Sequence, residues 1–149
     1  MSWDSSLEIG IEVIDNQHKE LIAAVENSIL TDSAQKGYDV FHSTMDFLES
    51  YVLQHFSDEE SFQKYSNYPN YSVHKSLHED LIQDLNEIKN QIDREGLNPK
   101  IIQAVNQFLL DWVIHHVSSA DMQFGKYYRK WNSENMNQSS NIEREKVTT

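Results

Sequence analysis

Apolar residues recur every three or four positions along most of the chain, the spacing that places side chains on one face of an α-helix. Such stripes cover four stretches: about 16 to the low thirties, 41–62, 74–92 and 102–128. The second is the most regular and steps through Phe41, Met45, Leu48, Val52, His55, Glu59 and Phe62. No strand pattern competes with these stripes. Because short connections favour antiparallel neighbours, the sequence predicts an all-α, antiparallel up-down-up-down four-helix bundle.

Turn and capping residues mark where these helices are expected to begin and end. We expect Asp15 to cap the first helix and Gly37 to lie in the connection that follows it. The segment 67–70 contains a proline and ends the second helix, since proline disfavours helical backbone in the residue before it. Gly96 ends the third helix, and Asn98, followed by proline, begins the fourth.

The two ends of the chain differ from these stripes. Residues 1–14 are rich in apolar side chains without helical spacing, and we expect an extended N-terminal arm packed over the bundle. They lack a basic region followed by an apolar run, so we expect no signal peptide. From Asn132 onward the chain is mostly polar, which predicts a disordered C-terminal tail at 132–149 after a bundle domain of residues 1–131.

Seven polar residues occupy inner positions of the helices, where core residues belong: His18, His55, Glu59, His74, His78, His116 and Asp121. Burying such groups without a partner is costly, so a common partner is implied. His74 and His78 are four residues apart and therefore share one helical face. Asp121 follows His116 by five residues, a step that turns it about 140° away on an ideal helix. A π-bulge, which inserts one residue, would return Asp121 to the inner face.

The types of residue in this set indicate a metal centre. A zinc site takes about four ligands, too few for seven residues, and calcium and magnesium prefer oxygen over imidazole. Two iron ions fit, with the two carboxylates as bridges. The two other histidines, His42 and His115, point away from the inner faces and are left out of the site.

The amino-acid composition limits the classes of metal site and binding partner and indicates the compartment in which we expect the protein. The chain has no cysteine, which excludes thiolate metal sites and is compatible with a reducing cytoplasm, where we expect the protein to be. A net charge of −12 argues against binding to nucleic acid or to an anionic membrane surface. No stretch is long and apolar enough to span a membrane.

These residues also give the chain a family resemblance. It resembles hemerythrin, especially the single-domain bacterial hemerythrins, over about residues 3–131. The matching motifs are Trp3, Gly10-Ile11, Ile14-Asp15-Asn16-Gln17-His18-Lys19, His55-Phe56, Glu59-Glu60, Tyr68-Pro69, His74-Lys75, His78, Trp112, His116 and Asp121.

The resemblance implies a role for each of the seven residues. One iron would be held by His74, His78 and His116. The other would be held by His18 and His55, which leaves it an open position. Glu59 and Asp121 would bridge both ions.

The resemblance further implies reversible dioxygen binding, without catalysis, for storage, transport, delivery or scavenging. Apolar residues one turn from the ligands would form the oxygen pocket: Leu21, Phe56, Leu81, Trp112, Val113 and Phe124. Val113 departs from the leucine common at this position in the family. Two alternatives stay open: a di-iron enzyme acting on peroxide or nitric oxide, and an oxygen or redox sensor acting through a separate partner. We expect a monomer.

Overall fold

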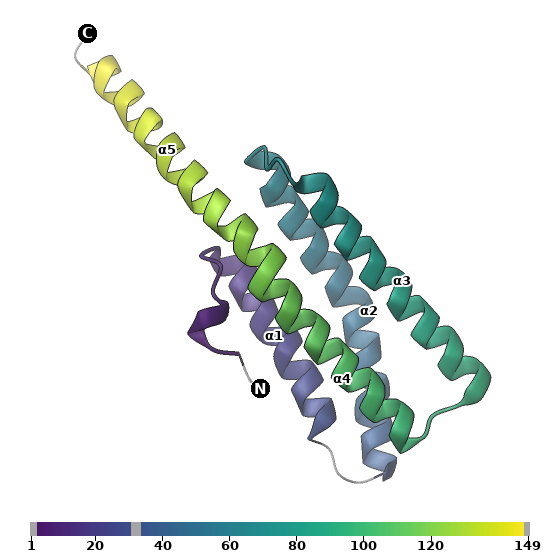
Figure 1. Cartoon of the computed structure of the whole chain (residues 1–149). Helices are drawn as coiled ribbons and strands as arrows, with labels where there is room; N and C mark the ends of the chain where they lie inside the picture. Colours follow the sequence, from purple (N-terminus) through teal and green to yellow (C-terminus); the bar gives the residue numbers. More distant parts are fainter. Residues whose placement is uncertain (1–2, 31–33, 148–149) are drawn as a thin grey trace.

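A computed structural model describes residues 3–30 and 34–147, and within these ranges the chain is helical apart from short connections and contains no strand. In chain order the elements are η1 (Ser5–Leu7), α1 (Glu12–Ile29), α2 (Ala34–Tyr65), α3 (Tyr71–Glu95), α4 (Pro99–His116), η2 (Val117–Asp121) and α5 (Met122–Val147). Because α4, η2 and α5 run on as a single rod, the molecule has four rods (Figure 1). They form the predicted antiparallel four-helix bundle.

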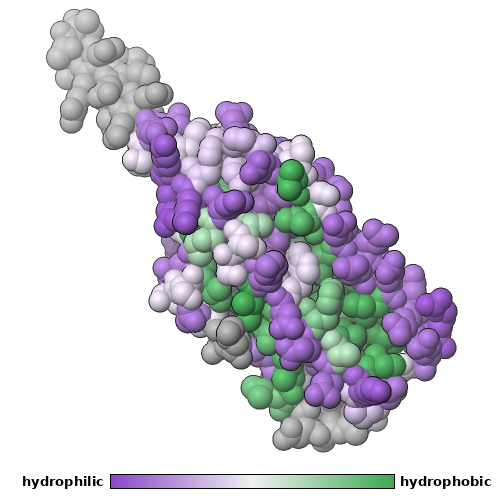
Figure 2. Space-filling view, viewed as in Figure 1, coloured by the Kyte–Doolittle hydropathy of each residue, from purple (hydrophilic) through white to green (hydrophobic). Residues whose placement is uncertain are grey.

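The rods enclose an apolar core that fills most of the bundle. Its fully buried members include Ile22 and Val25 of α1, Phe41 and Leu48 of α2, and Leu109 of α4. α1 packs against both α2 and α4, and α3 lies beside α2 (Figure 1). The half of the bundle away from the projecting end of α5 shows apolar surface between polar ridges (Figure 2).

The expected ends of α2, α3 and α4 are confirmed. α2 ends at Tyr65, just before the 67–70 segment. Gly96 follows α3 with a φ of 80°, a left-handed conformation that glycine adopts without steric cost. The side chain of Asn98 accepts a hydrogen bond from the backbone N–H of Ile101 at 2.9 Å and so caps α4.

Asp15 has another role than the expected N-cap. α1 already begins at Glu12, so residues 12–14 are helical rather than part of an extended arm, and Asp15 lies buried in the first turn. Its carboxylate accepts backbone hydrogen bonds from Ile9 at 2.8 Å and from Gly10 at 3.2 Å. Asp15 therefore holds the preceding arm against the helix.

The arm itself packs over the bundle, as expected. Ile9 is fully buried in a second apolar cluster with Ile14, Tyr68 and Phe124. Its carbonyl group lies so close to Gly125 of α5 that a Cβ atom at this position would clash with it. Glycine at 125 is therefore required for this close approach.

Two further boundaries differ from the prediction. Gly37 lies inside α2, where its cost of about 1 kcal/mol relative to alanine does not end a helix that buries Phe41 a turn later. α5 runs on to Val147, so the helical backbone extends through 132–147, where the sequence predicts a disordered tail, and neither glycine nor proline occurs after Gly125. The expected end of the first helix beyond Leu30 and the last two residues of the tail lie outside the described residues.

Candidate metal centre

Each of the four rods contributes to one buried polar cluster. α1 provides His18, α2 provides His55 and Glu59, α3 provides His74 and His78, and the α4–η2 segment provides His116 and Asp121. None of the seven side chains is more than 5 % exposed. The structure therefore brings together all seven residues that the sequence singles out.

The π-helical segment η2 places Asp121 on the same inner face as His116. It spans Val117–Asp121, where the five-residue step predicts a π-bulge, and that prediction is confirmed. The result is a distance of 3.0 Å between His116 Nε2 and Asp121 Oδ1. On the outer side of this segment, the hydroxyl groups of Ser118 and Ser119 donate to the carbonyl oxygens of Ile114 (2.7 Å) and His115 (2.5 Å).

The donor atoms fall into two groups that share both carboxylates. In each group, one nitrogen or oxygen per residue lies within 4.8 Å of those of the other members. One group contains His74, His78, His116, Glu59 and Asp121, and the other contains His18, His55, Glu59 and Asp121. Carboxylates that belong to both groups suit two cations side by side.

The contacts within the cluster fit metal ligands better than a hydrogen-bond network. His18 Nε2 faces His55 Nε2 at 3.2 Å, and His78 Nε2 faces His116 Nε2 at 3.2 Å, so lone pairs converge. Among the described residues, no hydrogen bond of ordinary geometry reaches the carboxylate oxygens of Glu59 or Asp121. Buried polar atoms are almost always partnered, and these atoms fit a cation.

Burial keeps two of the imidazoles neutral. Burial, followed by the neighbouring imidazole of His18, lowers the pKa of His55 to about 3. Burial, followed by the neighbouring imidazoles of His74 and His116, lowers the pKa of His78 to about 2. Neutral imidazole is the form that binds metal ions, so both rings are ready to act as ligands.

The remaining groups share protons within the cluster. Burial alone would lower the pKa of His74, but the close carboxylates of Asp121 and Glu59 raise it to about 9. Burial and the nearby charge of Asp121 raise the pKa of Glu59 well above its ordinary value. Burial also acts to raise the pKa of Asp121, but His116, His18 and His74 keep it well below its ordinary value. A bound cation would displace these protons, since ligands bind metals deprotonated.

Three outer residues orient the ligands, and sequence reasoning assigned them no role. Gln17 donates from Nε2 to Asp58 Oδ2 at 2.7 Å, which leaves its Oε1 to accept from His55 Nδ1 at 2.7 Å. Glu60 Oε2 accepts from His78 Nδ1 at 3.1 Å. Each bond fixes the tautomer that directs Nε2 into the cluster. Gln17 and Glu60 adjoin ligands in sequence, but nothing in the sequence indicates Asp58.

A small internal cavity of about 20 Å³ is lined by both histidines of the smaller ligand group, His18 and His55, and by His116 of the larger one. Five of the six residues expected to form an oxygen pocket line it: Leu21, Phe56, Leu81, Trp112 and Val113. Phe56 also stacks on His78 with ring centroids 3.7 Å apart, and Trp112 stacks on His116 at 4.4 Å.

Phe124 does not line this cavity. Although it lies three residues after Asp121, its fully buried ring packs into the arm cluster with Ile9 and Tyr68. It lies on the arm side of the metal centre because the arm crosses α5 at the neighbouring Gly125. His42 and His115 are exposed and belong to neither ligand group, in agreement with their exclusion.

Comparison with known proteins agrees with this geometry. The family model described as the hemerythrin HHE cation binding domain matches residues 9–128. The chain belongs to the hemerythrin family. Myohemerythrin of Theromyzon tessulatum is 25% identical over 122 residues, which cover 82% of this chain and 88% of the relative. Bacteriohemerythrin of Pseudomonas aeruginosa (strain UCBPP-PA14) is 28% identical over 120 residues, which cover 80% of this chain and 75% of the relative.

Solved hemerythrin structures share the fold. A crystal structure of wild-type hemerythrin superimposes with a TM-score of 0.70 at 20% sequence identity and covers 86% of this chain and 97% of that chain. Identity at this level supports the fold alone.

No helix in the described part of the chain is both long and apolar enough to cross a lipid bilayer.

Proposed function

We propose that this hemerythrin-family protein binds dioxygen reversibly at a centre of two iron ions. The observation that carries the proposal is the pair of ligand groups joined by Glu59 and Asp121, with an apolar cavity beside the smaller group. His74, His78 and His116 would hold one iron, and His18 and His55 the other. Two ferrous ions supply the electrons that reversible dioxygen binding needs.

The protein's own residues would control what reaches the second iron. That iron has only two histidines besides the shared carboxylates, and both of them line the cavity, whereas only His116 of the other group does. Leu21, Leu81 and Val113 are nearly fully buried walls of this cavity. Apolar walls admit a neutral gas and exclude water and proton donors, which favours binding over turnover.

Neutral ligands support the same function. His55 and His78 carry no charge, so the charge of two cations is offset mainly by Glu59 and Asp121. In an interior of low dielectric, uncompensated charge is costly. A centre whose net charge is the same before and after oxygen binds therefore favours a reversible reaction.

The proposal is tested by reducing the iron-loaded protein without oxygen and recording its visible spectrum before and after exposure to air. We expect about two irons per chain, as two ligand groups require, and an absorption change that reverses when oxygen is removed. One zinc per chain without retained iron would contradict the metal assignment. Turnover of hydrogen peroxide above that of free iron would contradict binding without catalysis.

A further inference from the structure

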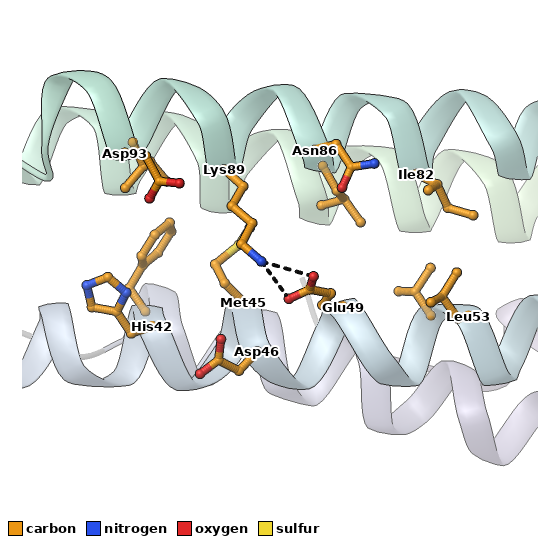
Figure 3. Close-up of a pocket in the computed structure, with 13 residues that line it drawn as sticks. His42, Met45, Asp46, Glu49, Leu53, Ile82, Asn86, Lys89 and Asp93 are labelled. Atoms are coloured by element: carbon orange, nitrogen blue, oxygen red, sulfur yellow. Dashed lines mark hydrogen bonds and ion pairs between the residues drawn. The ribbon is translucent and has the colours of Figure 1, made fainter.

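A groove with a volume of about 270 Å³ lies between α2 and α3. Leu53 of α2 faces Ile82 of α3 across it, Met45 lies farther along α2 opposite Lys89, and polar side chains border it (Figure 3). Lys89 spans the groove to both carboxylate oxygens of Glu49 at 3.0 Å. Both of these side chains are more than half exposed, so their ion pair is weak and does not close the groove.

This groove and the internal cavity beside the metal centre share two wall residues, Val52 and Leu85. On one side of them is the groove, and on the other is the space that His18 and His55 line. Two aliphatic side chains therefore separate the outer groove from the space next to the second iron.

Leu85 has room to move. It is half-buried, as are Ile82, Ile88 and Ile92 on the same half of α3, whereas Leu81 one turn earlier is only 2% exposed. A change of rotamer in a packed core meets its neighbours, whereas Leu85 has the open groove on one side. The wall can thus open through one side chain without any helix moving.

A second opening is less suitable as a path. It also lies between α2 and α3 and meets the internal cavity at Phe56. Phe56 is 4% exposed and lies flat on the ring of His78, with an interplanar angle of 1°. Moving Phe56 would break this stacking on a metal ligand, and charged residues including Glu60, Lys64 and Lys75 line the opening.

We propose that dioxygen reaches and leaves the internal cavity through the α2–α3 groove, past Val52 and Leu85. This inference rests on the proposed function. Dioxygen is small, neutral and apolar, so it suits a path with aliphatic walls. The internal cavity, at about 20 Å³, has room for about one molecule of this size.

The test compares Leu85→Trp and Leu85→Ala with Ile88→Trp, a control on the same half-buried helix face that lines neither cavity. Oxygen association and dissociation rates are measured by rapid mixing in the iron-loaded proteins. A residue on the path changes both rates by one factor and leaves the affinity unchanged. We expect Leu85→Trp to slow both about tenfold, or about 1.4 kcal/mol of barrier, and Leu85→Ala to speed both. Ile88→Trp should match the wild type.

Three results would overturn the inference: unchanged rates in both Leu85 variants, a changed dissociation rate alone, or an equal slowing by Ile88→Trp. Iron content and thermal stability are measured for each variant to identify one that misfolds. If Leu85→Trp misfolds, the rates of Leu85→Ala decide the test. Nitric oxide, also a small neutral molecule, binds ferrous iron without the electron transfer that oxygen needs. Its rates test the path even if oxygen does not bind, so the two failures are distinguishable.

Xenon, a neutral apolar atom, provides a readout that does not depend on iron chemistry. In crystals of the iron-loaded protein under xenon pressure, we expect xenon in the α2–α3 groove beside Leu85. Xenon in the opening beside Phe56, with none next to Leu85, would favour the other path and overturn the inference.

Discussion

At the scale of single residues, Glu59 and Asp121 are the groups that we expect to decide whether the centre holds one ion or two. Each belongs to both ligand groups, whereas every histidine belongs to one. Both side chains are fully buried, and without cations the protons shared within the cluster offset their charge. Removing either carboxylate should therefore affect both ions.

We predict that Glu59→Ala loses iron or retains about one ion per chain, because it removes a donor from both groups. Iron analysis after reconstitution measures the result. His42→Ala is the control, since His42 is exposed and lies outside both ligand groups. Two retained irons with an unchanged oxidised spectrum in Glu59→Ala would refute the bridging role.

The sequence reveals the ligands but not the residues around them. A histidine or carboxylate on an apolar stripe is conspicuous because burial without a partner is costly. Gln17 and Asp58 are not conspicuous, because polar residues are common on helix surfaces, and only the packing of α1 against α2 brings them to His55. The position of Phe124 outside the cavity is unpredictable for the same kind of reason, since the arm that surrounds it is distant in sequence.

At the scale of helices, the π-segment is the feature on which the ligand set depends. The five-residue step from His116 to Asp121 makes it predictable, because only an inserted residue keeps both on one face. The start of α1 was less predictable. Asp15 has the residue type of an N-cap, but its carboxylate binds the backbone N–H groups of the arm and not those of the helix. These hydrogen bonds form only because the arm folds back over the start of α1.

We predict that deleting Ala120 leaves the metal centre intact. The deletion shortens the step from His116 to the aspartate to four residues, and on a regular α-helix these two then lie only about 40° apart. The matched control inserts one alanine after Ala120, which turns the aspartate about 240° from His116. Iron content should be retained in the deletion and fall in the insertion. Loss of iron in both would mean that the π-geometry itself, rather than the facing of Asp121, is required.

At the scale of the whole molecule, the metal centre joins all four rods, and α3 depends on it most. The buried residues of α3 are His74, His78 and Leu81, so two of the three belong to the candidate metal centre. α1 buries seven residues, of which only His18 is a ligand. Because energy of metal binding is also folding energy, removing the metal should loosen α3 more than α1.

We therefore predict that metal removal speeds amide hydrogen exchange in α3 more than in α1. Exchange measured by mass spectrometry, with and without a chelator, compares 74–92 with 14–28 in the same molecule. The comparison is internal, so a general loss of stability does not imitate the result. The distal half of α3 has only half-buried apolar residues to hold it once His74 and His78 lose their ions. Equal increases in the two helices, or a larger one in α1, would show that apolar packing rather than the metal holds α3 in the bundle.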